Sequence, residues 1–133
     1  PNITPLGNYN EGAFDLNTFT SNFDTEIALY STTGTLIATN DDAGTGLQSQ
    51  ITPTLAIGTY YVVVGGFNSG FADGLAVPGA EAGNFVLNIN GGVAASGTLA
   101  AFTFAAYSIN VIPAPGAAAL AAMGLLVAGR RRR

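Results

Sequence analysis

The chain has 133 residues, enough for one domain and a tail, and its eight acids against four arginines give a formal net charge of −4. Every basic residue lies in the last four positions, so residues 1–129 carry eight acids, no Lys, Arg or His, and a net charge of −8. Without basic side chains, this part of the chain, called the body below, cannot bind phosphates tightly, which argues against nucleic acid as a partner. Its negative charge favours cations or uncharged molecules as partners. The chain also lacks Cys, which excludes disulfides and thiolate metal sites.

Residues 1–112 are predicted to be all-β, because Gly, Thr, Asn, Val and Tyr are frequent and turn formers recur at short intervals. No Met precedes Pro1, so we expect a processed or truncated N-terminus. The short strands between turns favour a small β-sandwich or jelly-roll-like domain over a parallel α/β fold. The candidate strands are Phe14–Thr20, Thr25–Ser31, Thr35–Thr39, Gln48–Leu55, Thr59–Gly65, Asn84–Asn90 and, with a break inside, Thr98–Val111.

Three segments predict finer features of this body. In "NFVLNIN", Phe85, Leu87 and Ile89 point one way and Asn84, Val86, Asn88 and Asn90 the other, which is typical of a sheet with one buried face. "STTGT" predicts a tight hairpin turn in which Gly34 has a positive φ. Residues 65–83 form the one long irregular stretch, from which Phe67, Phe71 and Leu75 are expected to pack back onto the body.

The acidic loop Asn40, Asp41 and Asp42 is the candidate metal site. Its oxygens suit Ca²⁺, with Asp24, Glu26 or Asp73 brought near by the fold, and Asp41 is the residue on which such a site most depends. The alternative is an Asx-type turn in which these side chains cap backbone N–H groups. The loop lacks the regular spacing of a dedicated calcium loop, which favours that alternative.

The sequence gives little support for sugar binding or catalysis. Tyr60 and Tyr61 lie on opposite faces of one predicted strand, so one belongs to the core and the other to an interface, a sugar-stacking patch or an ordinary sheet face. Without His, Cys or Lys, the triads and dyads of nucleophilic catalysis and zinc sites built on His or Cys are impossible. Only a carboxylate pair could act, as in a hydrolase, and eight scattered acids always allow some pair. We therefore expect no enzymatic activity.

The tail differs in composition from the body. Residues 114–129 contain no charged and no hydrogen-bonding side chain, and a helix from Gly116 would hold 14 residues before the arginines. That length is roughly 21 Å, against a hydrocarbon core of about 30 Å, so a permanent transmembrane helix is a poor fit. A buried terminal helix is the alternative, in which four arginines behind such an apolar run serve no packing purpose. The basic cluster comprises Arg130, Arg131, Arg132 and Arg133.

"IPAPGAAALAAMGLLVAGRRRR" resembles the PEP-CTERM sorting signal, in which a Pro-containing motif precedes a hydrophobic helix and a basic cluster. The motif here is Pro113, Ala114 and Pro115, which lacks the usual central Glu. The resemblance implies export, a transient membrane anchor in residues 113–133, and processing by an exosortase-type enzyme.

The middle of the chain, "FDTEIALY", "LIATNDD" and "GTYYVVVGGF", is similar to the DVUA0089-type domain, a relative of the bacterial pre-peptidase C-terminal (PPC) domains. Such domains usually begin with one or two further strands, which this chain is expected to lack. The resemblance implies a non-catalytic β-sandwich of a secreted, cell-surface or extracellular-matrix protein, and such domains in some cases bind Ca²⁺ or polysaccharide. The expected partners are thus the processing enzyme, the membrane, and exopolysaccharide or matrix proteins.

Overall fold

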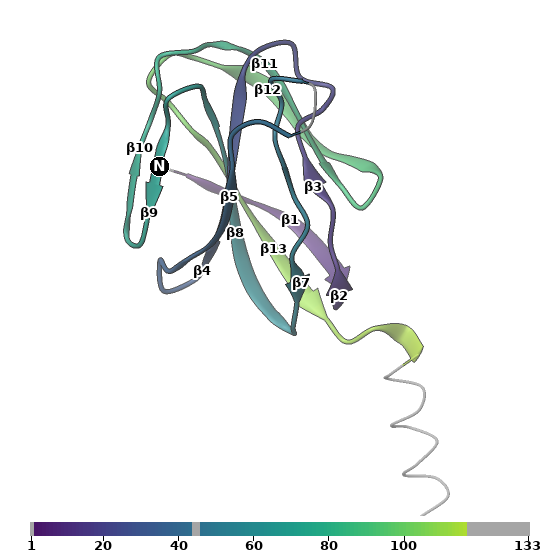
Figure 1. The fold of residues 1–133 in the computed structure, drawn as a ribbon. Coiled ribbons are helices and arrows are strands. Elements are labelled where there is room, and N and C mark those ends of the chain that lie inside the picture. The colour runs from purple at the N-terminus through teal and green to yellow at the C-terminus, as the bar shows by residue number, and fades with distance from the viewer. Residues whose placement is uncertain (1, 44–45, 117–133) are drawn as a thin grey trace, which may run out of the picture.

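The computed structural model describes residues 2–43 and 46–116, which form an all-β structure (Figure 1). The strands assemble two main sheets. The five-stranded sheet has the order β1 (Ile3–Asn10), β13 (Ala105–Ile112), β8 (Gly58–Gly66), β4 (Thr25–Ser31) and β5 (Leu36–Asn40). The four-stranded sheet has the order β12 (Gly92–Leu99), β11 (Gly83–Ile89), β3 (Leu16–Asn17) and β6 (Gln50–Ile51).

The core lies between these two sheets. Phe85, Leu87 and Ile89 of β11 are all buried, as their alternation predicts, and they belong to one apolar cluster with residues of the other sheet. That sheet contributes side chains from β4, β8 and β13, namely Ile27, Leu29, Val62, Val64, Ile109 and Val111. Two sheets sharing one apolar interior are consistent with a β-sandwich.

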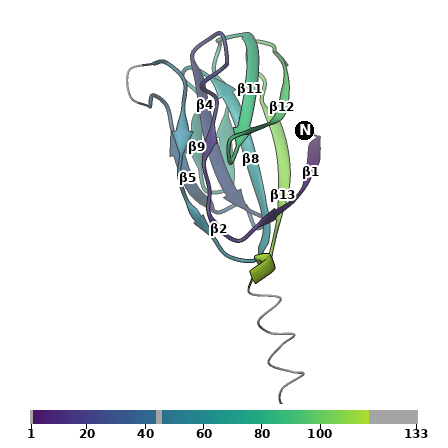
Figure 2. The ribbon, with the colours of Figure 1, turned by 90° about the vertical axis from the view of Figure 1, so that its right-hand side faces the viewer.

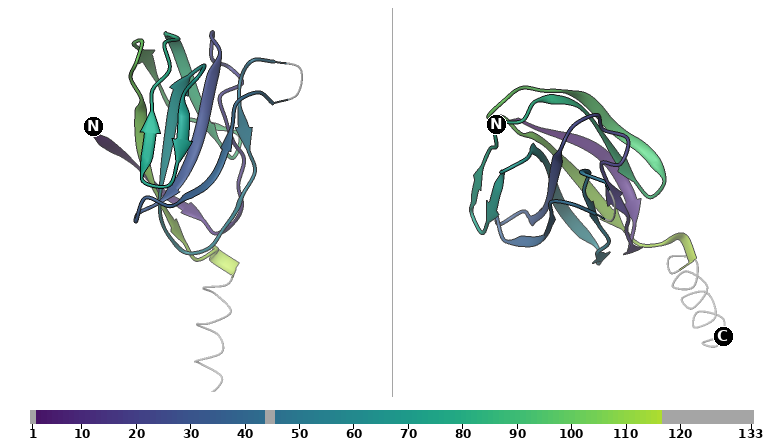
Figure 3. Two further views of the ribbon diagram at one scale, coloured as in Figure 1. Left: turned by 60° about the vertical axis from the view of Figure 1, so that its left-hand side comes forward. Right: turned by 45° about the horizontal axis from the view of Figure 1, so that its top comes forward.

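A small hairpin covers the other face of the five-stranded sheet (Figure 3). It consists of β9 (Gly70–Ala72) and β10 (Leu75–Val77), inside the stretch predicted to be irregular. Phe71 packs against Tyr30 and Phe104, with ring centroids 6.4 Å and 5.6 Å apart, as expected for a residue that returns to the body. The same expectation is wrong for Phe67, which is 42 % exposed. Because of this cover, β4 is buried on both faces.

The remaining predicted strands lie where they were expected, but some differ in length from the prediction. Thr25–Ser31 is confirmed as β4, and the turn after it has Gly34 at φ 86°. The segment Gln48–Leu55 is divided into β6 and β7 (Thr54–Leu55), because Pro53 has no N–H to donate, and β7 pairs with β2 (Gly12–Ala13). The break expected within Thr98–Val111 separates β12 from β13.

The expectation that no strand precedes Phe14 is wrong. β1 pairs in parallel with β13 and forms the edge of the five-stranded sheet (Figure 2). Its Pro5 and Gly7 obscure the strand pattern, and an edge strand tolerates both residues since one side of it needs no partner. Gly7, at φ 104°, lies where the register of the pairing shifts between Pro5 and Asn8.

The body has two distinct ends. Thr25 pairs with Gly66 at one end, and Gly58 pairs with Val111 at the other. The acidic loops lie at the first end, and the chain leaves the second end at Pro113 (Figure 1). Among the residues that the structure describes, no helix has the length and apolar character needed to cross a membrane. The predicted tail helix beyond Gly116 and Arg130–Arg133 lie outside the described residues.

Candidate metal centre

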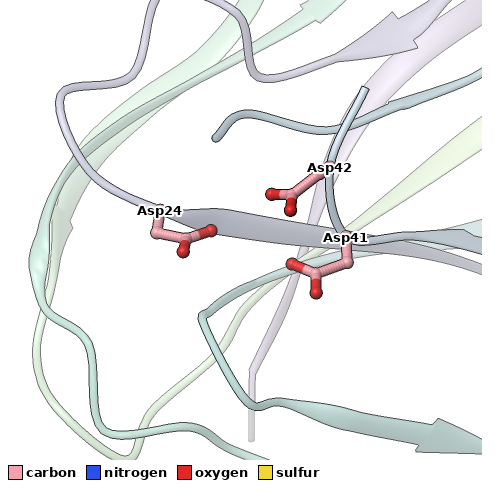
Figure 4. A group of neighbouring side chains, drawn as sticks. All are labelled: Asp24, Asp41 and Asp42. Atoms are coloured by element: carbon pink, nitrogen blue, oxygen red, sulfur yellow. The ribbon is translucent and has the colours of Figure 1, made fainter. Parts of the chain in front are cut away.

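Three aspartates meet at the first end of the body. Asp24 directly precedes β4, and Asp41 and Asp42 directly follow β5. These strands form an antiparallel hairpin in which Ile27 faces Asn40, so the residues just outside them lie side by side. Carboxylate oxygens of Asp24, Asp41 and Asp42 lie within 4.8 Å of one another and point into a common space (Figure 4).

A fourth carboxylate, that of Glu26, lies beside that of Asp41. The Glu26 side chain is only 6 % exposed, and its Oε1 accepts a hydrogen bond of 3.2 Å from the Asn68 N–H. Its Oε2 is buried and, in the ionised carboxylate, receives no hydrogen bond from the residues that the structure describes. Such an atom costs free energy unless a proton or a cation satisfies it.

Burial raises the pKa of Glu26 to about 7, and the charge of Asp41 and a hydrogen bond with the Asp41 side chain add to the effect. That hydrogen bond requires a proton between the two carboxyl groups, and with a pKa of about 7 Glu26 is only partly ionised at neutral pH when no cation is bound. Hydrogen bonds from the backbone N–H groups of Asn68 and Ser69 partly lower the pKa of Glu26.

Asp24 experiences the same crowding of negative charge. Its pKa is raised by burial and then by the charges of Asp42, Asp41 and Glu81. Its Oδ1 is, like Glu26 Oε2, a buried oxygen without a hydrogen-bond partner among the described residues. Since residues 1–129 contain no basic side chain, nothing in the body can neutralise this cluster. A bound cation would relieve this repulsion.

Buried hydroxyl groups hold the cluster in place. Thr18, Thr25 and Ser49 are each fully buried, and the Oγ1 atoms of Thr18 and Thr25 lie 2.6 Å apart in a hydrogen bond. The Ser49 N–H donates to Thr18 Oγ1 at 2.9 Å. Ser49 Oγ reaches the carbonyls of Thr25 and Asp41, and its single proton serves one of them at a time. This network ties β4 to the loop that carries Asp41.

A shallow pocket of about 310 Å³ borders the cluster. Its walls come from β4, β5 and the β9 region, and its lining residues are Glu26, Thr39, Asn40, Asp41, Ser69 and Phe71. Asp41 and Asp42 are exposed, so the cluster is reached from solvent on this side.

Only some of the residues predicted for a metal site lie together in the structure. It brings together Asp24, Asp41 and Asp42, with Glu26 beside Asp41. Asn40 Oδ1 instead accepts a hydrogen bond of 3.1 Å from the Gln50 N–H, so it satisfies a backbone N–H of β6 and not one within its own turn. Asp73 is not part of the cluster either, because its Oδ1 accepts from the Leu36 N–H at 2.8 Å.

The supporting residues Ser49, Thr18 and Asn68 were missed by the sequence analysis. Their roles depend on contacts across 31 to 42 positions of the chain, which no local pattern reveals. Glu26 was named as a candidate, and it lies two positions after Asp24, which directly precedes β4.

The carboxylates fit a hydrolase poorly. Glu26, whose pKa is raised, is in hydrogen-bond contact with Asp41. Glycoside hydrolysis requires carboxyl groups separated by about 5 Å or more, with the bond to be broken between them. This pair leaves no such space.

At the opposite end, the predicted sorting motif follows the last strand without a gap. β13 ends at Ile112, and Pro113 comes next. The Ala114 N–H donates to Glu11 Oε1 at 3.4 Å, so the start of the motif lies against the body.

Comparisons with protein-family models, with curated proteins and with solved structures found no match for this chain.

Proposed function

We propose that this protein is a non-catalytic, Ca²⁺-binding β-sandwich of an exported surface or matrix protein. The observation that carries the proposal is the cluster of Asp24, Asp41 and Asp42, with Glu26 beside Asp41 and its buried Oε2 without a hydrogen-bond partner in the described part of the chain. Ca²⁺ prefers oxygen ligands such as carboxylates, and this end of the body brings together those of Asp24, Asp41 and Asp42. Because residues 1–129 contain no basic side chain, only a bound cation or a proton can compensate the charge of this cluster.

The choice of Ca²⁺ over smaller cations rests on the form of the site. Mg²⁺ demands near-ideal octahedral geometry, whereas Ca²⁺ accepts irregular sets of six to eight oxygens. The ligands here come from two separate segments at a sheet edge, without the spacing of a dedicated loop. Such an irregular, partly exposed set suits the weak Ca²⁺ sites of extracellular modules, with dissociation constants of about 0.1–1 mM.

Thermal unfolding with and without Ca²⁺ tests the proposal. At 10 mM Ca²⁺, dissociation constants of about 0.1–1 mM predict an added stability of about 1.4–2.7 kcal/mol. The melting temperature of the full chain, held in mild detergent, should therefore rise by about 5 °C or more. Replacing Asp41 by Asn should remove this rise. A melting temperature that Ca²⁺ leaves unchanged would show that the cluster is only an acidic surface.

The tail supports the second half of the proposal, that the protein is exported and sorted. Pro113, Ala114 and Pro115 separate the end of β13 from a run without a polar side chain, and Arg130–Arg133 complete the pattern. We propose that an exosortase-type enzyme processes this segment after the arginines have held it at the cytoplasmic side of the membrane. Mass spectrometry of the protein from its native host is the test. Arg130–Arg133 retained on the mature surface protein would refute removal of the tail.

A further inference from the structure

We infer that the pocket beside the acidic cluster binds a neutral sugar, whose adjacent hydroxyl groups coordinate the Ca²⁺ held by Asp24, Asp41 and Asp42. The inference rests on the proposed Ca²⁺ site and extends it to a ligand class. Glu26 is buried, lies beside Asp41, and has no hydrogen-bond partner at Oε2 among the described residues, so it adds a fourth carboxylate that favours a cation here. Asp41 is exposed and also lines the pocket, so ligand oxygens in the pocket can reach a cation held by Asp41.

The charge of the body decides between neutral and anionic ligands. One Ca²⁺ changes the charge of residues 1–129 from −8 to −6, and that of the three-aspartate cluster from −3 to −1. An anionic headgroup or uronate would still meet net repulsion at this end, and no basic side chain is there to hold it. Hydroxyl oxygens coordinate Ca²⁺ without adding negative charge. The ligand should therefore be uncharged and rich in hydroxyl groups.

The walls of the pocket suit one sugar ring. Its volume of about 310 Å³ lies at the lower end of the range of about 300–1,000 Å³ for small-molecule sites. Phe71 provides an apolar surface for the C–H face of a ring, and its packing on Tyr30 and Phe104 fixes its orientation. Since Asn40 Oδ1 already accepts from Gln50, Asn40 offers its amide NH₂ as a donor to a sugar oxygen.

The position of the pocket agrees with such a role. The chain leaves the body at Pro113, at the end opposite to the cluster (Figure 1). A tail held in a membrane would thus direct the pocket away from that membrane, toward surrounding polysaccharide.

Affinity electrophoresis of the full chain in mild detergent tests the inference, with mannan, galactan or dextran in the gel and alginate as the anionic counterpart. At 5 mM Ca²⁺ at least one neutral polysaccharide should retard the protein several-fold more than alginate does. The retardation should disappear in chelator, and the free monosaccharide should compete with it. Asp41→Asn should abolish both Ca²⁺ binding and retardation. Phe71→Leu should keep Ca²⁺ affinity and weaken retardation about three- to ten-fold.

Each other outcome has a distinct meaning. Ca²⁺ binding without retardation by any neutral polysaccharide would overturn the sugar site and leave the proposed function standing. Retardation that persists in chelator would show that the sugar is not held through Ca²⁺, and stronger retardation by alginate would refute the charge argument. No Ca²⁺ binding at all would refute the proposed function itself. Competition by the free sugar is measured on the unaltered chain, so it does not depend on how Phe71→Leu folds.

Discussion

Replacing Glu26 by Gln should make the Ca²⁺-free protein more stable at alkaline pH. Glu26 is 6 % exposed, and its pKa is raised from 4.5 to about 7, first by burial and then by Asp41. A carboxyl group with a raised pKa stabilises the fold fully below its unfolded pKa, and this contribution is lost as pH rises through the folded pKa. Stability should therefore fall between about pH 4.5 and pH 7, and level off above pH 8.

The size of the effect follows from the two pKa values. Their difference, at about 1.36 kcal/mol for each tenfold change in proton affinity, corresponds to about 3 kcal/mol. The amide introduced by Glu26→Gln carries no charge at any pH, its oxygen can still accept from the Asn68 N–H, and its NH₂ can donate to Asp41. The variant should match the wild type near pH 4 and exceed it by up to about 3 kcal/mol at pH 8.

Urea unfolding in calcium-depleted buffer at a series of pH values measures this difference. Glu81→Gln is the matched control, because Glu81 is an exposed acid at the same end and its replacement removes the same charge. The control should raise the free energy of unfolding at pH 8 much less than Glu26→Gln does. Parallel pH profiles for wild type and Glu26→Gln would refute the account, since they would mean that Glu26 is ionised at little cost in the folded protein.

Further substitutions test the fold and the strain in its loops. Leu87→Ala should lower the free energy of unfolding by about 2–5 kcal/mol because Leu87 is fully buried, whereas Leu47→Ala, at a residue 56 % exposed, should change it little in chemical denaturation. Gly79→Ala should lower the free energy of unfolding by about 1–3 kcal/mol, because the added Cβ would lie 2.0 Å from the Phe67 carbonyl oxygen. Gly70→Ala is the control, because its added Cβ would lie 3.8 Å from the nearest atom, Val77 Cβ. Phe102→Asn should stabilise the protein by about 1 kcal/mol, because Phe102 has φ 59° and is 67 % exposed, and a lower melting temperature would show that its ring packs after all.

Much of the fold is predictable where local pattern and tertiary position agree. β4 and the alternation of β11 follow from runs in which apolar residues face one core. β12 was missed over residues 92–97 because an exposed edge strand of Gly, Ala and Ser carries no such pattern. The β9–β10 hairpin was missed because its strands have only three residues each, and its pairing depends on the sheet beneath.

The candidate site was predictable in part for a similar reason. The hairpin that joins β4 to β5 was expected, and antiparallel pairing alone brings the residue before one strand to the residues after the other. That geometry accounts for Asp24 meeting Asp41 and Asp42, and it leaves out Asp73. The burial of Glu26 was not predictable, because it results from cover by residues near Asn68 that are 42 positions away.

Calorimetric titration of the full chain with Ca²⁺ tests the central claim most directly. We predict saturable binding of one Ca²⁺ per chain with a dissociation constant of about 0.1–1 mM. The variant Asp41→Asn with Asp42→Asn should bind no Ca²⁺, and Asp73→Asn, which loses one acid outside the cluster, should bind as the wild type does. Absence of saturable binding to the wild type, or equal weakening by Asp73→Asn, would contradict the assignment of this cluster as a Ca²⁺ site.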